Sequence, residues 1–343
     1  MATSRREFVW QSAATVGAVL VPPGCEGGQD SRKKSTTEPA AAFEPGYLAL
    51  ERSGELAKRE QTLWQRLGDC DVCARGCGAN RPAGEVGVCS TPARFKVYSS
   101  GPHFGEEAEL VGRNGSGTVF FSHCNLLCSF CQNWEINHRG DGSRTSPSEL
   151  AEIFLGLQRR GCHNINLVTP SHLVPQIVKA VRIAAGRGLH LPLVYNTGGY
   201  DNPEVIEQLD GIIDIYLPDF KYQDGKLAAT YSSGVSDYPV VAAEVIREMH
   251  RQVGDLQTDP KNIATHGLIL RHLVMPNNIG GTDRLVRWIA AELGPDTYFN
   301  LMAQYRPEHK AFDIPEISRR ITKAEWRQAL TWAREAGLTN VHT

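Results

Sequence analysis

The sequence predicts an α/β protein, a partial (β/α)6 barrel preceded by a cysteine-rich extension. Three observations predict this fold. Strand-like and helix-like runs alternate from about residue 115 onward, as in repeated βα units around a parallel sheet. Several of the helices carry sequence signals for their first turn, and polar residues accumulate where the strands should end. The chain has 343 residues, which is enough for one large domain of this kind.

Each expected strand is a short run of apolar and β-branched residues. Such runs lie at 118–122, 164–169, 191–196, 212–217, 267–274 and 297–301. The first of them, Thr-Val-Phe-Phe-Ser, is apolar enough to be buried and leads directly into a loop rich in cysteine. Six βα units close most naturally as a partial barrel, which we place at residues 113–343.

The expected helices are marked at their ends. Ser146 and Glu149 have the spacing of a capping box, with a proline between them at the first helical turn. Thr322 and Glu325 form a second capping box that starts the last helix, and Gly337 is placed to end it.

The composition excludes some classes of function. The formal net charge is −2, and charged residues make up 22% of the chain, so nothing favours a nucleic-acid groove or a polybasic membrane surface. Nine cysteines are many for an intracellular enzyme. Seven of them fall into two dense groups, a distribution that indicates metal ligation more than a disulfide network.

The amino terminus resembles an export signal. Arg5 and Arg6 form a twin arginine, and a weakly apolar stretch follows as far as a Pro-Pro-Gly-Cys sequence that ends at Cys25. We interpret residues 1–25 as a twin-arginine-like signal or a lipoprotein leader, with Cys25 as the lipid anchor, and residues 26–45 as a flexible linker. The alternative is a flexible tail that contains a chance pair of arginines.

The first cysteine group follows the first expected strand. Cys124, Cys128 and Cys131 are spaced C-x3-C-x2-C, and Phe130 is placed to pack over whatever they hold. Iron–sulfur clusters usually take four thiolates, so three with no fourth nearby would leave one iron open to a small molecule. The alternatives are a zinc site, which favours paired C-x2-C motifs, or scattered buried thiols.

The second group lies within a cysteine-rich extension at residues 46–112. Cys70, Cys73, Cys77 and Cys89 are separated by two, three and eleven residues, with several glycines between them. Four thiols suffice for a closed site, either a zinc ion or a fully ligated cluster, and such a site would be structural or would transfer electrons. Disulfide pairing after export is the alternative.

Further polar residues stand at the expected strand ends, where barrel enzymes place their chemistry. His172 follows the second strand, Asn196 ends the third, Asp219 and Lys221 follow the fourth, and Arg271 lies on the fifth. Asp219 and Lys221 also fit an exposed turn, and His172 also fits a helix cap.

Three more side chains deserve a prediction. Asn133, two residues after the last clustered cysteine, either braces its loop or contacts a bound nucleoside. Glu106 and Glu107 are expected to be solvated acids, with a second pocket beside His103 as the alternative.

These motifs resemble a known family. The spacing Cys124, Cys128, Phe130, Cys131 after a first barrel strand resembles the signature of radical S-adenosylmethionine (radical SAM) proteins. From about Cys70 to the carboxyl terminus, the chain is similar to a branch of that superfamily related to the activating enzyme of pyruvate formate-lyase. The runs that carry this similarity include Tyr-Asn-Thr-Gly-Gly-Tyr at 195–200, Leu-Pro-Asp-Phe-Lys-Tyr at 217–222 and Arg-His-Leu-Val-Met-Pro at 271–276.

The resemblance implies a [4Fe-4S] cluster on the three cysteines and S-adenosylmethionine on its fourth iron. Asp219 and Lys221 match an Asp-x-Lys that contacts S-adenosylmethionine in the activating enzymes, and Arg271 matches an arginine on their fifth strand. Asn196 stands where those enzymes have an aspartate. Their Gly-Gly-Glu after the second strand is absent, and the stretch that contains His172 occupies its place.

The expected function is therefore that of a radical SAM enzyme. An external donor would supply one electron, S-adenosylmethionine would be cleaved to a 5′-deoxyadenosyl radical, and the radical would take a hydrogen atom from a substrate. The substrate would be a glycine of a partner protein or a small molecule. The alternative is a non-catalytic exported iron–sulfur or zinc protein. This chemistry is typical of the cytoplasm, whereas the twin arginine indicates export, so the location stays open.

Overall fold

The computed structural model describes residues 43–343. A largely parallel β-sheet lies at the centre of this part of the chain. The predicted leader, Cys25 and nearly all of the predicted linker lie outside the described residues. Within residues 43–343, no helix combines the length and the apolar character needed to cross a membrane.

The six predicted strands are present and lie side by side in sequence order. They are β2 (Ser116–Phe121), β4 (Ile165–Val168), β5 (Leu193–Thr197), β6 (Ile215–Pro218), β8 (Ala264–Leu273) and β9 (Tyr298–Met302). Every neighbouring pair in this series is parallel, and β10 (Val341–His342) extends the sheet beyond β9 in the same direction. The predicted α/β fold with a partial parallel barrel is therefore confirmed.

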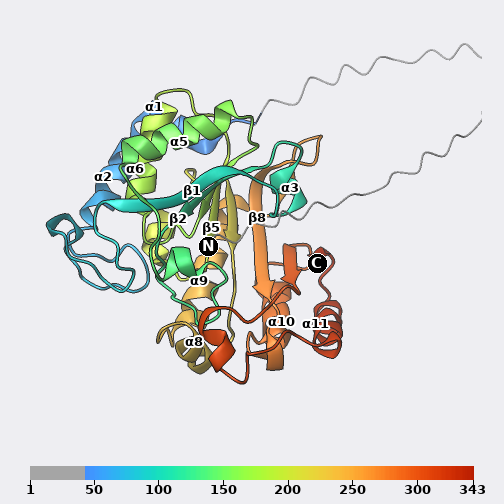
Figure 1. Cartoon of the computed structure of the whole chain (residues 1–343). Coiled ribbons are helices and arrows are strands. Elements are labelled where there is room, and N and C mark those ends of the chain that lie inside the picture. Colours follow the sequence, from blue (N-terminus) through green and yellow to red (C-terminus); the bar gives the residue numbers. More distant parts are fainter. Residues whose placement is uncertain (1–42) are drawn as a thin grey trace, which may run out of the picture. The chain divides into compact units, whose positions relative to one another are not determined.

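Helices follow the strands and surround the sheet (Figure 1). Both predicted capping boxes form, at Ser146 before α5 and at Thr322 before α11, and Gly337 has a positive φ of 81° just past the end of α11. The helices are α5 (Pro147–Arg159), α6 (Val174–Ala185), α7 (Pro203–Glu207), α8 (Gly225–Tyr231), α9 (Tyr238–Val253), α10 (Thr282–Glu292) and α11 (Lys323–Glu335).

The extension is continuous with this sheet. β1 (Phe95–His103) pairs antiparallel with β2, and β3 (Ser143–Thr145) pairs with β1. The helices α1 (Gly46–Ser53) and α2 (Glu55–Gln65) pack on α6. The short elements that complete the fold are η1 (Arg81–Ala83), α3 (Ala108–Val111), α4 (Trp134–Asn137), β7 (Gln257–Thr258), η2 (Pro276–Asn278) and η3 (His309–Asp313).

A buried carboxylate fastens the extension to the barrel. Asp214 accepts hydrogen bonds from the backbone N–H of Gly46 (3.2 Å) and from that of Leu193 (2.9 Å). Burial raises its pKa to about 7, because no cation compensates the charge among the described residues.

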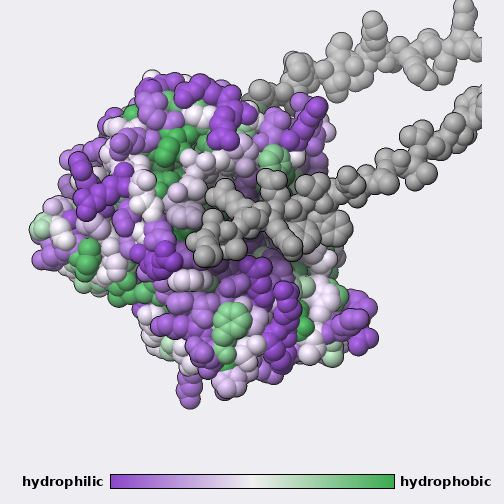
Figure 2. Space-filling model, in the orientation of Figure 1, coloured by the Kyte–Doolittle hydropathy of each residue, from purple (hydrophilic) through white to green (hydrophobic). Residues whose placement is uncertain are grey.

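Apolar side chains of the strands and helices form the core, which includes Phe121, Phe154, Leu167 and Phe299. The visible surface of the described residues is mostly hydrophilic, with small apolar areas (Figure 2). Buried polar side chains are therefore the most informative indication of a functional site in this fold.

Candidate functional site

A cavity of about 770 Å³ opens at the carboxyl ends of the parallel strands. Barrel enzymes place their chemistry at this end, because the loops that follow the strands converge there. Most of the residues predicted from the sequence line this cavity together: Cys124, Cys128, Phe130, Cys131, Asn133, Asn196, Asp219, Lys221 and Arg271.

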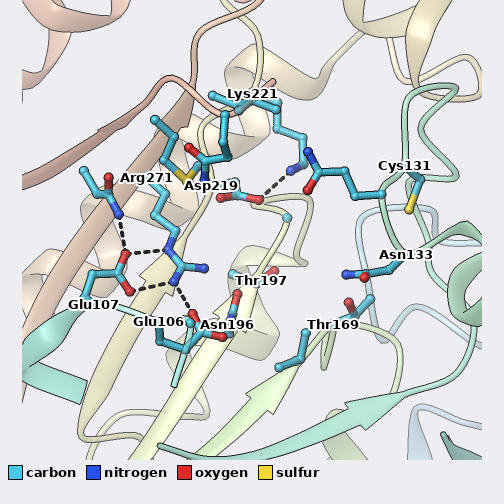
Figure 3. A pocket seen from close by; sticks show the side chains of 18 of the residues that line it. Glu106, Glu107, Cys131, Asn133, Thr169, Asn196, Thr197, Asp219, Lys221 and Arg271 are labelled. Carbon is cyan, nitrogen blue, oxygen red and sulfur yellow. Dashed lines mark hydrogen bonds and ion pairs between the residues drawn. The ribbon is translucent and has the colours of Figure 1, made fainter. Parts of the chain in front are cut away.

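Figure 3 shows how the cavity is organised. Cys131 and Asn133 lie on one side, Arg271 and Glu107 lie on the opposite side, and Asp219 and Lys221 lie between them. The cavity thus has a sulfur-bearing wall and a charged wall.

The sulfur-bearing wall is the loop after β2. Its three sulfurs each accept a hydrogen bond, from a different donor in each case. The N–H of Leu126 donates to Cys124 Sγ (3.3 Å), the hydroxyl of Ser232 to Cys128 Sγ (3.0 Å), and the side-chain amide of Asn137 to Cys131 Sγ (3.3 Å). Such donors stabilise sulfur that carries negative charge, as thiolate ligands of a metal cluster do.

Without a metal these thiols hold their protons. Burial raises the pKa of Cys124 to about 11, and burial also raises the pKa of Cys128 and of Cys131. A metal that binds here must displace those protons, so binding and proton release are coupled.

Phe130 closes the floor of this wall. Its ring packs against the rings of Tyr222 and Tyr305, with centroid distances of 6.3 and 6.0 Å. Tyr305 itself does not line the cavity and donates its hydroxyl to the carbonyl of Ile317. Aromatic packing therefore holds Phe130, the residue just before Cys131, in place.

An ion pair stands between the two walls. Asp219 directly follows β6, and Lys221 Nζ donates to its carboxylate at 2.5 Å. Burial alone would lower the pKa of Lys221, but the charge of Asp219 and the hydrogen bond to its carboxylate outweigh burial and raise the pKa. Lys221 therefore stays protonated at any working pH.

The charged wall corrects one prediction. Glu106 and Glu107 are not solvated acids: their side chains are 9% and 3% exposed, and both pair with Arg271 on β8. Glu107 accepts from Arg271 Nε (2.7 Å) and Nη2 (2.6 Å), and from Asn300 Nδ2 (2.6 Å). Burial would raise the pKa of Glu107, but the guanidinium beside it lowers the pKa overall.

His172 does not line the cavity, contrary to its predicted place in the site. It is fully buried, and its Nε2 donates to the carbonyl of Ser122 at 3.1 Å, just past the end of β2. Burial lowers its pKa to about 3, so the imidazole is neutral and braces the start of the cysteine loop from behind.

The second cysteine group lies outside the cavity. Cys70, Cys73 and Cys89 are buried, and Cys77 is exposed. Within residues 43–343, no three His, Cys, Asp or Glu side chains converge closely enough to form a ready-made site for a single metal ion.

Sequence patterns missed several side chains at this site. Ser232 comes from the end of α8, and Asn300 from β9, so their contacts depend on the tertiary fold. Asn137 lies six residues after Cys131, on the short helix α4, and no motif marks it. For Glu106 and Glu107 a signal existed, since two adjacent acids follow β1, the strand that pairs with the first barrel strand. Their partner, however, lies more than 160 residues away.

Comparisons with known proteins agree with this site. The family model of the radical SAM superfamily matches residues 118–221, a segment that contains the three cavity cysteines and ends at Lys221. An uncharacterized protein from Methanocaldococcus jannaschii is 31% identical over 283 residues, which are 80% of this chain and 77% of that protein.

Two solved structures align with lower similarity. Methylornithine synthase (PylB) is 13% identical with a TM-score of 0.42, over 88% of this chain and 82% of its own. HydG, a maturase of the [FeFe]-hydrogenase, is 12% identical with a TM-score of 0.43, over 63% of this chain and 48% of its own. From the family match and the archaeal relative, the chain belongs to the radical SAM superfamily, a superfamily of enzymes that implies a [4Fe-4S] cluster and S-adenosylmethionine.

Proposed function

We propose that Cys124, Cys128 and Cys131 hold a [4Fe-4S] cluster and that S-adenosylmethionine binds beside it in the cavity. One observation carries the proposal: three thiols line the cavity, each with a hydrogen-bond donor on its sulfur, and among the described residues no fourth cysteine lines it. The donor set fits a cluster with one iron left for a small molecule. When bound and reduced, the cluster and S-adenosylmethionine supply cleavage to a 5′-deoxyadenosyl radical that abstracts hydrogen.

The charge of the cavity supports the same ligand. Four acidic side chains line it, Glu106, Glu107, Glu109 and Asp219, against two basic ones, Lys221 and Arg271. A net negative cavity favours a ligand with net positive charge, and S-adenosylmethionine carries a sulfonium and an ammonium against one carboxylate.

Individual residues have separable tasks in this proposal. Lys221 and Asp219, which hold each other in one geometry, offer a cation for the carboxylate of the ligand and an anion for its ammonium group. Asn196 presents an amide where the related activating enzymes have an aspartate. The buried floor under Phe130 excludes water from the sulfur-bearing wall.

The substrate that gives up hydrogen is one of two kinds. The resemblance of Asp219, Lys221 and Arg271 to the activating-enzyme pattern favours a glycine of a partner protein. A small molecule is the second candidate, because 770 Å³ lies within the usual range of small-molecule sites. Either substrate needs an external one-electron donor.

The test needs no knowledge of the substrate. The protein is loaded anaerobically with iron and sulfide, reduced with dithionite in the presence of S-adenosylmethionine, and assayed for 5′-deoxyadenosine by mass spectrometry. Wild-type protein should form the product and Cys128→Ala should form none, whereas Cys162→Ala, a buried cysteine outside both groups, should match the wild type. A fully loaded wild-type sample that forms no 5′-deoxyadenosine refutes the proposal.

The binding step can be tested separately. Asp219→Asn should keep its full iron content but lose roughly 10- to 100-fold in affinity for S-adenosylmethionine, since one charged hydrogen bond contributes about 1.5–3 kcal/mol. Asp224→Asn is the matched control, because Asp224 caps α8 and does not line the cavity.

A further inference from the structure

The loop between α2 and β1 carries four cysteines that the cavity does not use. Its backbone folds tightly around them: Gly78 has a positive φ of 68°, and a side chain at Gly87 would come within 2.2 Å of Cys77 Sγ. Apart from the single turn of η1, the segment from residue 66 to residue 94 has no helix or strand. Ordered loops of this length within a compact domain usually serve a function.

A buried cation stands against these sulfurs. Arg81 is 1% exposed, yet no carboxylate pairs with it anywhere in residues 43–343. Its Nη1 donates to the carbonyl of His172 (2.7 Å) and lies 3.9 Å from Cys70 Sγ, and its Nη2 donates to the carbonyl of Pro92 (3.2 Å). Its Nε is buried and has no hydrogen-bond partner among the residues that the structure describes.

Such an arrangement is costly unless something supplies negative charge. An uncompensated buried guanidinium loses its hydration, and carbonyl dipoles replace only part of it. The nearest group able to carry an anionic charge is the sulfur of Cys70. The structure thus places a cation where thiolates, and not neutral thiols, would balance it.

A second arginine of the same loop also lacks a carboxylate partner in the described residues. Arg75 is only partly buried, its Nη1 donates to the carbonyl of Ser233 (2.9 Å), and its guanidinium lies 5.7 Å from the ring of Tyr200. A metal bound by four thiolates carries a net charge of about −2, whether the metal is zinc or a [4Fe-4S] core. Arg81, the arginine in contact with a sulfur of this loop, offsets part of that charge.

This loop also contacts the loop of the first site. Arg75 Nε donates to the carbonyl of Asn125 at 2.7 Å, and Asn125 directly follows Cys124. On the other side, Cys73 forms a single β-bridge with Asp201, and Asn125 Nδ2 donates to the carbonyl of Tyr200 at 2.6 Å. The two cysteine loops therefore share a boundary of direct hydrogen bonds.

We propose that Cys70, Cys73, Cys77 and Cys89 bind a second metal centre through four thiolates, with Arg81 as its counter-charge. The centre is separate from the cavity, has no open ligand position and stands whether or not the first site cleaves S-adenosylmethionine. Binding of the metal releases the protons of the four thiols. Because no three of these side chains converge closely enough for a single ion in residues 43–343, the structure favours the larger iron–sulfur core over a zinc ion. An iron–sulfur core here would be placed to pass electrons to the neighbouring loop.

The test is a metal count on the full chain. Wild type, the double variant Cys73→Ala/Cys89→Ala and the control Cys162→Ala are loaded anaerobically and analysed for iron, sulfide and zinc. The double variant should lose one whole centre, about four irons with their sulfide or about one zinc, and should keep the first site. Equal metal content in the double variant and the wild type would overturn the proposal.

A complementary variant covers the case in which the double variant does not fold. Replacing Cys124, Cys128 and Cys131 together with alanine removes the first site and should leave the metal of the second. Iron with sulfide identifies a cluster and zinc alone identifies a zinc ion, whereas a metal-free triple variant contradicts the proposal. So do disulfides among Cys70, Cys73, Cys77 and Cys89 in anaerobically purified wild type, detected by alkylation without reduction.

The rate at which Arg81 variants lose metal to a chelator distinguishes a counter-charge from a purely structural residue. Arg81→Gln should lose the second metal to a chelator at least several-fold faster than wild type, and Arg81→Lys, which keeps the charge, should restore most of the retention. Equal loss from the glutamine and the lysine variants would contradict the role of Arg81 as a counter-charge.

Discussion

The two cysteine loops use the same ligand in different surroundings. Cys124, Cys128 and Cys131 line a cavity at the carboxyl ends of the strands, whereas the cysteines of the loop at residues 70–89 lie outside it, three of them buried and one, Cys70, in contact with a buried arginine. Three thiolates beside a cavity would leave room for a reacting molecule, and a centre ligated by four thiolates would leave none. If both proposals hold, access to the metal, more than ligand type, separates the two sites.

The two loops also differ in how charge is balanced. In the cavity every buried ion has a counter-ion: Lys221 pairs with Asp219, and Arg271 pairs with Glu106 and Glu107. In the second loop, Arg81 has only carbonyls and a sulfur. Each basic side chain of the cavity therefore has a carboxylate partner before any cofactor binds, whereas Arg81 has none in residues 43–343.

The largest expected effect is the difference in activity between a cysteine variant of the first loop and one of the second. Cys128→Ala should reduce 5′-deoxyadenosine formation more than 1,000-fold, which corresponds to about 4 kcal/mol or more. Cys73→Ala should stay within roughly tenfold of the wild type when dithionite supplies the electron, because the first site is intact. The measurement is the initial rate of product formation per loaded first site.

The comparison would fail if Cys73→Ala lost activity as completely as Cys128→Ala while its first site retained full iron. The two loops would then act as one site, and the distinction between an open and a closed loop would have no functional meaning.

A second experiment removes the two carboxylate partners of Arg271 one at a time. Glu107→Gln removes the carboxylate that accepts hydrogen bonds from Nε and Nη2 of Arg271 and from Asn300 Nδ2. The free energy of unfolding should therefore fall by about 3 kcal/mol. Glu106→Gln removes a single contact with the same guanidinium and should cost about 1 kcal/mol. Urea unfolding of both variants gives the difference. Equal losses would show that Arg271 does not distinguish its two partners.

Asp214 is a third case, a buried carboxylate held only by backbone N–H groups. Its folded pKa of about 7 lies above its ordinary value of 3.8, so the folded state keeps the proton longer than the unfolded state does. The stabilisation is complete below about pH 4, decreases as the pH rises, and is lost above about pH 7. The total change is on the order of 4 kcal/mol.

Asp214→Asn should remove that slope. The difference in unfolding free energy between wild type and variant, measured from pH 4 to pH 8, should shift steadily in favour of the variant as the pH rises. Loss of one backbone hydrogen bond lowers the variant's stability by about 1 kcal/mol at every pH, so the slope and not the offset is the result. A difference independent of pH would contradict the raised pKa.

Much of this architecture could be predicted from the sequence, and the reason is local. Strand periodicity, the capping boxes at Ser146 and Thr322, and the cysteine spacing are properties of short segments, and all of these elements appear where they were expected. The parallel order of the strands then brought Asp219, Arg271 and the cysteines to one edge of the sheet.

What could not be predicted depends on side-chain direction and on distant partners. The chain turns at Thr169, whose positive φ of 64° is rare for a β-branched residue, and His172 packs behind β2 instead of lining the cavity. Glu107 becomes buried only because Arg271 and Asn300 meet it from two other strands. No local pattern contains either fact.

The smallest expected effect tests one hydrogen bond to a sulfur of the first loop. Ser232 donates to Cys128 Sγ at 3.0 Å, and such a bond favours the more negatively charged, reduced state of a thiolate-bound cluster. Ser232→Ala should therefore lower the midpoint potential of the loaded first site by roughly a few tens of millivolts, since the bond contributes about 1 kcal/mol. Ser129→Ala is the matched control: Ser129 directly follows Cys128, and its hydroxyl is buried and makes no hydrogen bond within residues 43–343. If both variants shift the potential equally, the change reflects repacking around Cys128 and the sulfur hydrogen bond does not tune this site.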